Sequence, residues 1–243
     1  MGIRLNSTLV TVSAVAFTIL VSQPVGATTY TDATGEATVG GQLGAPGSQI
    51  LDIASVEVTN TATDVIFKIN LSGDPVATDW GKYMIGIDSV VGGSTTSDGW
   101  ARPISMSSGM DFWSGSWADS GNGIELYNWN GSSWSLTNAS YGYAQTLSFS
   151  KDTSSVTLTL PLASMGLSAG STFTFDVYTS GGGGSDSAVD ALGNPSQTIA
   201  NWGDAYDSST LVNSYTVVPE PSSCALLALG GLALAGVLRR RRS

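Results

Sequence analysis

The sequence predicts an all-β protein: an antiparallel, jelly-roll-like β-sandwich with an N-terminal signal peptide and a single C-terminal transmembrane helix. Between residues 28 and 217, short runs of alternating apolar and polar side chains recur, and no helical periodicity of any length is present. Clusters of Gly, Ser, Asp and Asn separate these runs, as turns do in antiparallel sheets. Both ends of the chain carry apolar stretches flanked by arginine, a pattern typical of targeting segments. We therefore divide the chain into residues 1–27, 28–217 and 218–243.

The N-terminal segment has the parts of a secretory signal. Arg4 precedes an apolar stretch at 9–21, and Val25 and Ala27 place compact side chains at the two positions that a signal peptidase reads. We expect cleavage after Ala27, with an uncleaved membrane anchor as the alternative. The remaining domain of roughly 190 residues is long enough to bury a core of its own.

Residues 65–71 show the strand pattern most clearly. Val65, Phe67, Ile69 and Leu71 alternate with more polar neighbours, as expected when one face of a strand lies in a core. Pro161 precedes a segment at 162–167 that predicts one short helical turn, and 181–209 is a long, pattern-poor loop. Comparable strand patterns occur at 51–59, 82–88, 124–129, 133–137, 146–150, 155–160, 172–179 and 211–217.

Composition excludes several classes of function. The exported domain has 4 basic and 18 acidic residues, a formal charge of −14, which disfavours nucleic acid and suits calcium or plain solubility. The chain has no histidine, so triads and zinc sites that need histidine are excluded. Its one cysteine, Cys224, lies outside the domain, which therefore has no disulfide.

The dipeptide Asn130-Gly131 predicts a two-residue type I′ hairpin turn. With these residues at the tip, Tyr127 faces Trp134, and Trp129 lies on the same side of the hairpin. Ile124 and Leu126 occupy the other side. If those two point into the core, the aromatic residues form an exposed platform on which a sugar ring can stack; if the aromatic residues point inward, they are ordinary core.

Acidic residues near these aromatic residues offer a second possible site. Asp88 ends a predicted strand, and Asp98 and Asp111 follow in the next loops. Calcium binds about six to eight oxygen ligands, so these loop ends could hold it; the alternative is that they are solvated turn aspartates. Paired carboxylates also serve glycoside hydrolysis, but no motif selects a pair, and we expect no enzyme activity.

The C-terminal segment has a defined order. Val218, Pro219, Glu220 and Pro221 precede an apolar helix predicted at 222–238, which spans roughly 25 Å at 1.5 Å per residue. Arg239, Arg240, Arg241 and Arg242 follow and should stay on the cytoplasmic side. The prolines favour an extended spacer before the helix.

This order resembles the PEP-CTERM sorting signal of Gram-negative bacteria. The resemblance covers 218–242, about a tenth of the chain. It implies transient anchoring in the inner membrane, cleavage near Glu220 by exosortase, a membrane cysteine transpeptidase, and an association with exopolysaccharide at the cell surface or in the extracellular matrix.

The exported domain is also similar to family-nine-like, or DOMON-like, carbohydrate-binding sandwich modules. The pattern consists of an acidic start at 32–36, a strand pair, a strand that ends in Ile87-Asp88, and later aromatic residues. This resemblance implies sugar held between aromatic side chains and, in some members, bound calcium. The residues carried over are Trp100, Trp113, Trp117 and Trp129 for stacking, and Asp88 and Asp98 for calcium.

Together these features predict an exported, exosortase-sorted, non-catalytic surface or matrix protein that associates with extracellular polysaccharide. The alternatives are a purely structural or adhesive surface protein whose aromatic residues are all core and, third, a glycan-active hydrolase. Signal peptidase and exosortase are the expected processing partners, and nucleic acid is not expected to bind.

Overall fold

The structure, a computed structural model, describes residues 26–43, 48–143, 146–209 and 212–219. These residues form strands in two large sheets and two small ones, and the only helices among them are the 3₁₀ turns η1 (Ser48–Leu51) and η2 (Leu162–Met165). No helix in this part of the chain is long and apolar enough to cross a membrane. The predicted signal peptide, the helix at 222–238, and the arginines Arg239 to Arg242 lie outside the described residues.

The first large sheet has five strands in the order β1-β4-β5-β12-β11, all antiparallel to their neighbours. The strands are β1 (Thr28–Thr31), β4 (Ile53–Asn60), β5 (Asp64–Leu71), β12 (Ser155–Pro161) and β11 (Ser148–Lys151).

The second large sheet has seven strands in the order β10-β9-β8-β6-β13-β14, with β16 also paired to β13. The strands are β10 (Trp134–Ala139), β9 (Gly123–Trp129), β8 (Phe112–Trp117), β6 (Lys82–Asp88), β13 (Thr172–Ser180), β14 (Asp190–Ala191) and β16 (Asn213–Thr216). The two small pairs are β2 (Thr38–Val39) with β3 (Gln42–Leu43), and β7 (Ile104–Ser105) with β15 (Tyr206–Asp207).

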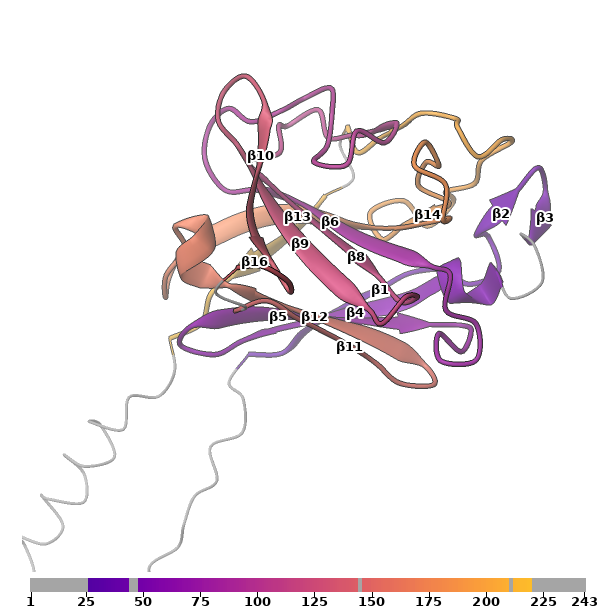
Figure 1. Cartoon of the computed structure of the whole chain (residues 1–243), viewed down its shortest axis with the longest axis horizontal. Helices are drawn as coiled ribbons and strands as arrows, with labels where there is room; N and C mark the ends of the chain where they lie inside the picture. The colour runs from indigo at the N-terminus through magenta and orange to yellow at the C-terminus, as the bar shows by residue number, and fades with distance from the viewer. Residues whose placement is uncertain (1–25, 44–47, 144–145, 210–211, 220–243) are drawn as a thin grey trace, which may run out of the picture.

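The two large sheets stack face to face and enclose one apolar core, as Figure 1 shows. Phe67 on β5 contacts Phe173 and Phe175 on β13 across the interior, with ring centroids 6.4 and 5.3 Å apart. The four alternating residues predicted to face the core are buried, from Val65 at 0% exposed to Leu71 at 6%. The predicted antiparallel sandwich is confirmed.

The connections between strands are mostly local. β4–β5 and β11–β12 are hairpins, and β8, β9 and β10 form a meander within one sheet. Strands that follow one another in sequence are thus mostly neighbours in the same sheet. A jelly roll instead alternates its successive strands between two sheets, so the connectivity does not follow the jelly-roll pattern that we expected.

Each of the nine strands expected from the sequence is present, and so is the helical turn, which corresponds to η2 and ends at Gly166 in the left-handed conformation (φ 65°). The central strand β8 was not expected. Its sequence Phe-Trp-Ser-Gly-Ser-Trp shows no alternation of apolar and polar residues, and five of its six residues are buried because both sides of this strand are covered. The edge strand β1, with only four residues, was also missed.

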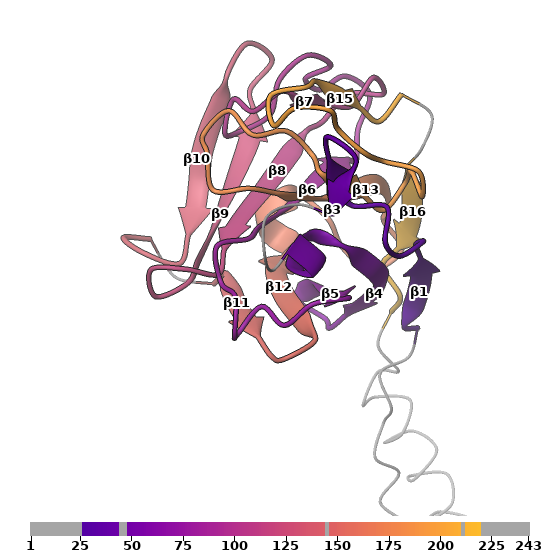
Figure 2. The same cartoon turned by 90° about the vertical axis from the view of Figure 1, so that its right-hand side faces the viewer.

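The outer face of the seven-stranded sheet carries a second apolar cluster. Met84, Trp113 and Tyr178 point away from the main core and pack against Met106 and Tyr206 from the long connections. Residues 89–111 and 181–209 supply these covering connections, which lie above the sheet in Figures 1 and 2. The sheet is therefore buried on both faces, and its two faces are covered by different kinds of structure.

The two ends of the described domain meet. The Tyr215 hydroxyl donates a 2.8 Å hydrogen bond to Asn60 and lies 3.4 Å from the carbonyl oxygen of Gly26, and Asn60 exchanges two hydrogen bonds with the backbone of Val218. Ala27, the predicted cleavage position, is exposed, and β1 begins at the next residue. Gly26, just before the predicted signal-peptidase site, and Val218 therefore lie at one corner of the domain, and the predicted cleavage site near Glu220 lies outside the described residues.

Candidate functional site

The β9–β10 hairpin differs in its turn from the sequence prediction. Trp129 pairs with Trp134, so the loop has four residues, 130–133, and not two. Asn130 closes this loop because its side-chain oxygen accepts hydrogen bonds from the backbone N–H groups of Ser132 and Ser133, both at 3.0 Å. Up to Leu136 the pairing is shifted by two residues from the predicted one, which leaves these side chains on their predicted faces, and a bulge between Leu136 and Asn138 shifts the remaining pairs by one more residue.

The two faces of this hairpin are both covered, but to different degrees. Ile124 and Leu126 are fully buried in the main core, so Tyr127, Trp129 and Trp134 point outward, as the platform hypothesis requires. All three residues are half-buried rather than open: Tyr127 and Trp134 pack against the outer apolar cluster, and Trp129 packs against Trp134. The Trp134 indole N–H, for example, donates to the carbonyl of Ser97 at 3.1 Å.

The apolar cleft of interest lies at the other end of the sheet. Its lining combines two half-buried indoles with two cations, and its volume is about 310 Å³. The lining residues are Lys82, Trp100, Arg102, Trp117 and Gly184. They come from the start of β6, the end of β8 and the two covering connections, so the cleft exists only once those connections lie over the sheet.

Glycines on the sheet allow the two indoles to lie flat against it. A Cβ at Gly115 would stand 2.4 Å from the Trp100 ring, and a Cβ at Gly123 would stand 1.9 Å from the Trp117 ring. Real Cβ atoms do not approach other atoms so closely, so any larger residue would displace the rings. Glycine at these two strand positions therefore fixes where the aromatic wall of the cleft can stand.

Three aromatic side chains form a continuous row at the cleft. The centroids of Trp100 and Trp117 are 6.4 Å apart, and Trp117 lies 6.3 Å from Tyr141, which is 48% exposed. Glu125 on β9 orients the row by accepting hydrogen bonds from the Trp100 indole at 2.7 Å and from the hydroxyls of Tyr127 and Tyr141. Its hydrogen bond and negative charge, together with partial burial, raise the pKa of Tyr141 to about 12, so the phenol stays neutral.

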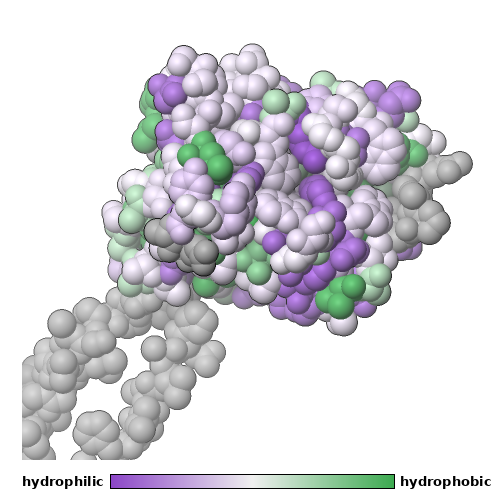
Figure 3. All heavy atoms as spheres, in the orientation of Figure 1, coloured by the Kyte–Doolittle hydropathy of each residue, from purple (hydrophilic) through white to green (hydrophobic). Residues whose placement is uncertain are grey.

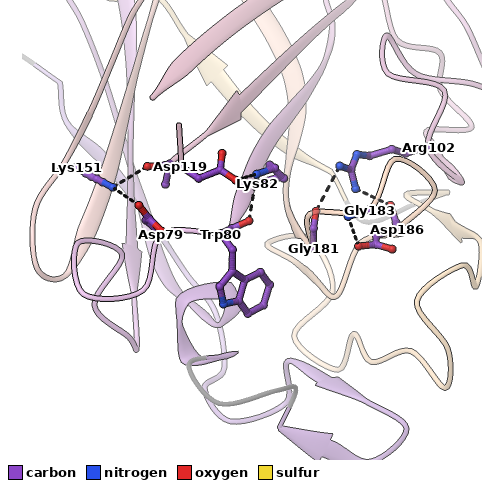
Figure 4. Close-up of polar contacts among 10 residues, drawn as sticks. Asp79, Trp80, Lys82, Arg102, Asp119, Lys151, Gly181, Gly183 and Asp186 are labelled. Atoms are coloured by element: carbon purple, nitrogen blue, oxygen red, sulfur yellow. Dashed lines mark hydrogen bonds and ion pairs between the residues drawn. The ribbon is translucent and has the colours of Figure 1, made fainter. Parts of the chain in front are cut away.

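Two cations lie at the cleft, and both are held in place (Figure 4). Lys82 forms an ion pair with Asp119 at 2.9 Å and also donates to the carbonyl of Trp80. Arg102 donates to Ser180 at 2.7 Å and to the carbonyls of Asp186 and Gly181, which joins the two covering connections.

The Arg102 guanidinium also lies 5.4 Å from the centroid of the Trp100 ring, within cation–π range. The site is thus an aromatic surface with fixed donors at its edge. Such a surface can stack on an apolar ring face while the donors bind hydroxyl or carboxylate oxygens.

The four predicted stacking residues fall into three environments. Trp100 and Trp117 stand together in the cleft. Trp113 is 0% exposed and stacks on Tyr178, with centroids 5.7 Å apart, so it is a core residue with no ring face for a ligand. Trp129 is half-buried against Trp134 at the end of β9 away from Gly123, the residue that pairs with Trp117, so it lies outside the cleft.

Among the described residues, neither predicted calcium residue belongs to a group of three acids whose oxygens lie close enough to hold one metal ion. Asp88 lies at the end of β6, beside an open pocket with Ser108 and Thr174. Asp98 is buried in the connection above the outer face, where it accepts a 2.6 Å hydrogen bond from the backbone of Trp100, and burial raises its pKa to about 7. Calcium at these two residues stays a prediction.

The sequence patterns did not identify Glu125, Tyr141 and Lys82 as members of the site. Glu125 is the one acid on β9 and lies on the same face as Tyr127 and Trp129. This position beside the predicted aromatic platform could have marked it as a member of the site. Tyr141 and Lys82 gave no signal, because only the tertiary fold brings them to Trp117.

Comparison with known proteins concerns the C-terminal segment alone. Residues 217–242 match the family of the PEP-CTERM protein-sorting motif, and comparison with curated proteins gave no match. The match includes Val218, Pro219, Glu220, Pro221 and the four arginines named above. It implies export, a membrane-anchored sorting signal and processing by exosortase. The chain therefore carries a PEP-CTERM sorting motif, which supports an exosortase-sorted, exported surface protein.

Proposed function

We propose that the exported domain is a non-catalytic module that binds extracellular polysaccharide at the cleft lined by Trp100 and Trp117. The observation that carries the proposal is the row of Trp100, Trp117 and Tyr141, which is held by Glu125 and bordered by Lys82 and Arg102. A pyranose ring has one apolar C–H face and hydroxyls at its edge. The C–H face could stack on the indole rings, and the hydroxyls could form hydrogen bonds with Lys82 and Arg102 at the edge of the cleft.

The cleft favours binding over hydrolysis. Glycoside hydrolysis needs one carboxyl group to donate a proton and a second to act as nucleophile or base. Both oxygens of Glu125 already accept hydrogen bonds from aromatic donors, and Asp119 is paired with Lys82. These carboxylates are therefore engaged in holding the walls of the cleft.

The position of the cleft suits a protein delivered by a C-terminal signal. Lys82 pairs with Ser180 at one end of β13, whereas Thr172 pairs with Thr216 at the other end, close to Val218. A nine-residue strand spans roughly 25 to 30 Å at about 3.3 Å per residue. The cleft would thus point away from the end at which the sorting motif begins.

The sorting motif supports the rest of the proposal. A helix at 222–238, with its arginines on the cytoplasmic side, would hold the chain in the inner membrane of a Gram-negative cell until exosortase cuts near Glu220. The domain would then reach the cell surface or the extracellular matrix, where exopolysaccharide is its expected ligand. Figure 3 shows only separate small apolar patches on one face of the domain, as suits an aqueous exterior.

Affinity electrophoresis in gels that contain the organism's own polysaccharide or common glycans tests the binding proposal. The exported protein should be retarded, and Trp117→Ala and Trp100→Ala should each abolish most of the retardation. Trp129→Ala is the matched control, because it removes a half-buried indole from the same sheet outside the cleft. If none of these glycans retards the parent protein, the structural or adhesive alternative is the better description.

A further inference from the structure

Four carboxylates gather where the two sheets meet at one edge of the domain. Asp32 directly follows β1, and Glu36 lies four residues further along the same connection. Asp52 directly precedes β4, and Asp190 begins β14. β1 and β4 belong to the five-stranded sheet and β14 to the seven-stranded sheet, so this carboxylate cluster bridges the sandwich.

Three of these acids already have the spacing of a cation site. One oxygen each from Asp32, Glu36 and Asp190 all lie within 4.8 Å of one another. Asp190 is fully buried, and it is positioned by backbone N–H groups of Ile53 and Ala191, each 2.7 Å from one of its oxygens. A fixed, desolvated carboxylate therefore lies at the base of the cluster.

The fourth acid, Asp52, is an independent indication of a missing ligand. Its side chain is 2% exposed, one oxygen accepts a 2.8 Å hydrogen bond from the N–H of Gly35, and the other oxygen has no partner. Gly35 directly precedes Glu36, so this hydrogen bond holds Asp52 beside the cluster. Three further buried oxygens without partners belong to the cluster, one on Asp32 and both on Glu36.

No ion pair among the described residues involves these acids. The ion pairs in this part of the chain join Lys82 to Asp119 and Lys151 to Asp79, Arg102 bonds at the aromatic cleft, and Lys68 lies opposite Glu57 on the paired strands β4 and β5. Buried carboxylates that lack a cation or a donor are costly, and several close together repel one another. Burial and mutual repulsion accordingly raise the pKa values of Asp32, Glu36 and Asp190.

We propose that Asp32, Glu36, Asp52 and Asp190 bind one calcium ion. The ligands are all oxygens, which favours a hard cation, and the cluster mixes partly exposed with fully buried acids, so waters can complete the six to eight ligands that calcium accepts. Magnesium requires a tighter octahedral arrangement and retains its own waters, so it should bind much more weakly here.

Calcium at this point would join the two sheets. Asp32 and Asp52 would connect the ion to β1 and β4, and Asp190 would connect it to β14. β1 is a four-residue edge strand, and the segment after it carries Glu36. Binding should therefore protect the N-terminal part of the domain most strongly against local opening.

The first test is thermal unfolding of the exported protein after treatment with chelator. Calcium should raise the Tm by roughly 5 °C or more, and the rise should grow with concentration, because the ion binds the folded state. Magnesium at the same concentration should give little or no rise, and calorimetry should show about one calcium per chain. No rise in Tm up to about 10 mM calcium, or an equal rise with magnesium, would overturn the assignment.

The second test uses Glu36→Gln, which should keep the fold because neither oxygen of Glu36 has a hydrogen-bond partner among the described residues. Without metal this variant should melt at or above the parent Tm, because it removes one charge from a repelling cluster. Its affinity for calcium should be at least about tenfold lower than that of the parent protein. The matched control is Asp88→Asn, which should retain parental affinity; the opposite pattern would return the calcium site to Asp88 and contradict the proposal.

Discussion

The two faces of the seven-stranded sheet are both buried, but they are covered in different ways. On the inner face, aliphatic residues and phenylalanines such as Phe173 and Phe175 pack against a second regular sheet. On the outer face, Trp113 and Tyr178 pack beneath long connections that have little regular structure. Among the described residues, the glycines against which the indole rings of the cleft pack lie on the outer face, and the cleft at Trp100 and Trp117 forms on that face.

This difference separates two roles for apolar side chains. The inner face satisfies the general need for a core, which many packings of similar volume could meet. The outer face holds its covering connections at fixed places, and one of these connections carries Arg102, a cation at the edge of the candidate site. We infer that the inner face provides stability and that the outer face provides stability together with recognition.

The largest expected change in the free energy of unfolding comes from substitutions that test whether the outer face is a second core. Phe67→Ala in the main core and Trp113→Ala on the outer face should each lower the free energy of unfolding by about 3 to 5 kcal/mol, because both side chains are fully buried. Urea denaturation followed by circular dichroism measures both. A loss below about 1 kcal/mol for Trp113→Ala would show that the connections cover the sheet only loosely.

The next effect concerns pH. Asp98 lies in the outer layer, and its native pKa of about 7 exceeds the unfolded value of 3.8, so the folded state holds its proton more tightly. The protonated Asp98 contributes its full stabilisation below about pH 4, and this stabilisation is lost as the pH rises to about 7. Because each pKa unit corresponds to ~1.4 kcal/mol, the free energy of unfolding should fall by at most about 4 kcal/mol over this range. Denaturation midpoints between pH 4 and 8, with chelator present, should fall less steeply in Asp98→Asn than in the parent. Identical slopes would exclude Asp98 as a source of the pH dependence.

A smaller effect is expected where the outer face meets the cleft. Gly115→Ala places a methyl group against the Trp100 ring and should cost about 1 to 3 kcal/mol by overpacking. Tryptophan fluorescence and polysaccharide binding should change together, because the displaced ring is part of the cleft wall. Gly131→Ala, at a glycine with positive φ (94°) but open space around it, is the control that strains the backbone without touching the cleft.

The smallest effect on stability should accompany a large effect on binding. Trp117 is half-buried, so Trp117→Ala should cost about 1 kcal/mol of stability, yet it should weaken polysaccharide binding at least about tenfold. Measuring unfolding and affinity on the same preparation separates the two quantities. A loss of stability equal to that of Trp113→Ala, with unchanged binding, would make Trp117 a core residue.

The sequence predicted the inner face well and the outer face poorly. β5 was clear because one side of it meets the core and the other side is more open, which produces alternation along the chain. β8 was missed because both of its sides are covered, so large aromatic residues stand on opposite faces at Phe112 and Trp113 and no alternation results. The turn at Asn130 was given the wrong length, although the faces of the strands were right, because faces repeat every two residues.

The candidate sites show the same limit. Trp100 and Trp117 were selected by residue type, but the same criterion selected Trp113, which is core. Calcium was expected at Asp88 and Asp98, and the carboxylate cluster for which we propose it brings together residues as far apart in the sequence as Asp32 and Asp190. Side-chain type indicates which chemistry is available, and it does not indicate which distant residues will meet.

The sequence by itself determined the local and compositional properties of this protein. The sorting motif at 217–242, the acidic and histidine-free composition, and the strands with one buried face all follow from neighbouring residues or from counts. Only the tertiary structure decided that two connections cover the outer sheet, that an aromatic cleft forms beneath them, and that four acids meet between the sheets. Those features depend on contacts between residues far apart in the chain, whose approach is set by the packing of the whole sandwich and leaves no periodic trace in the sequence.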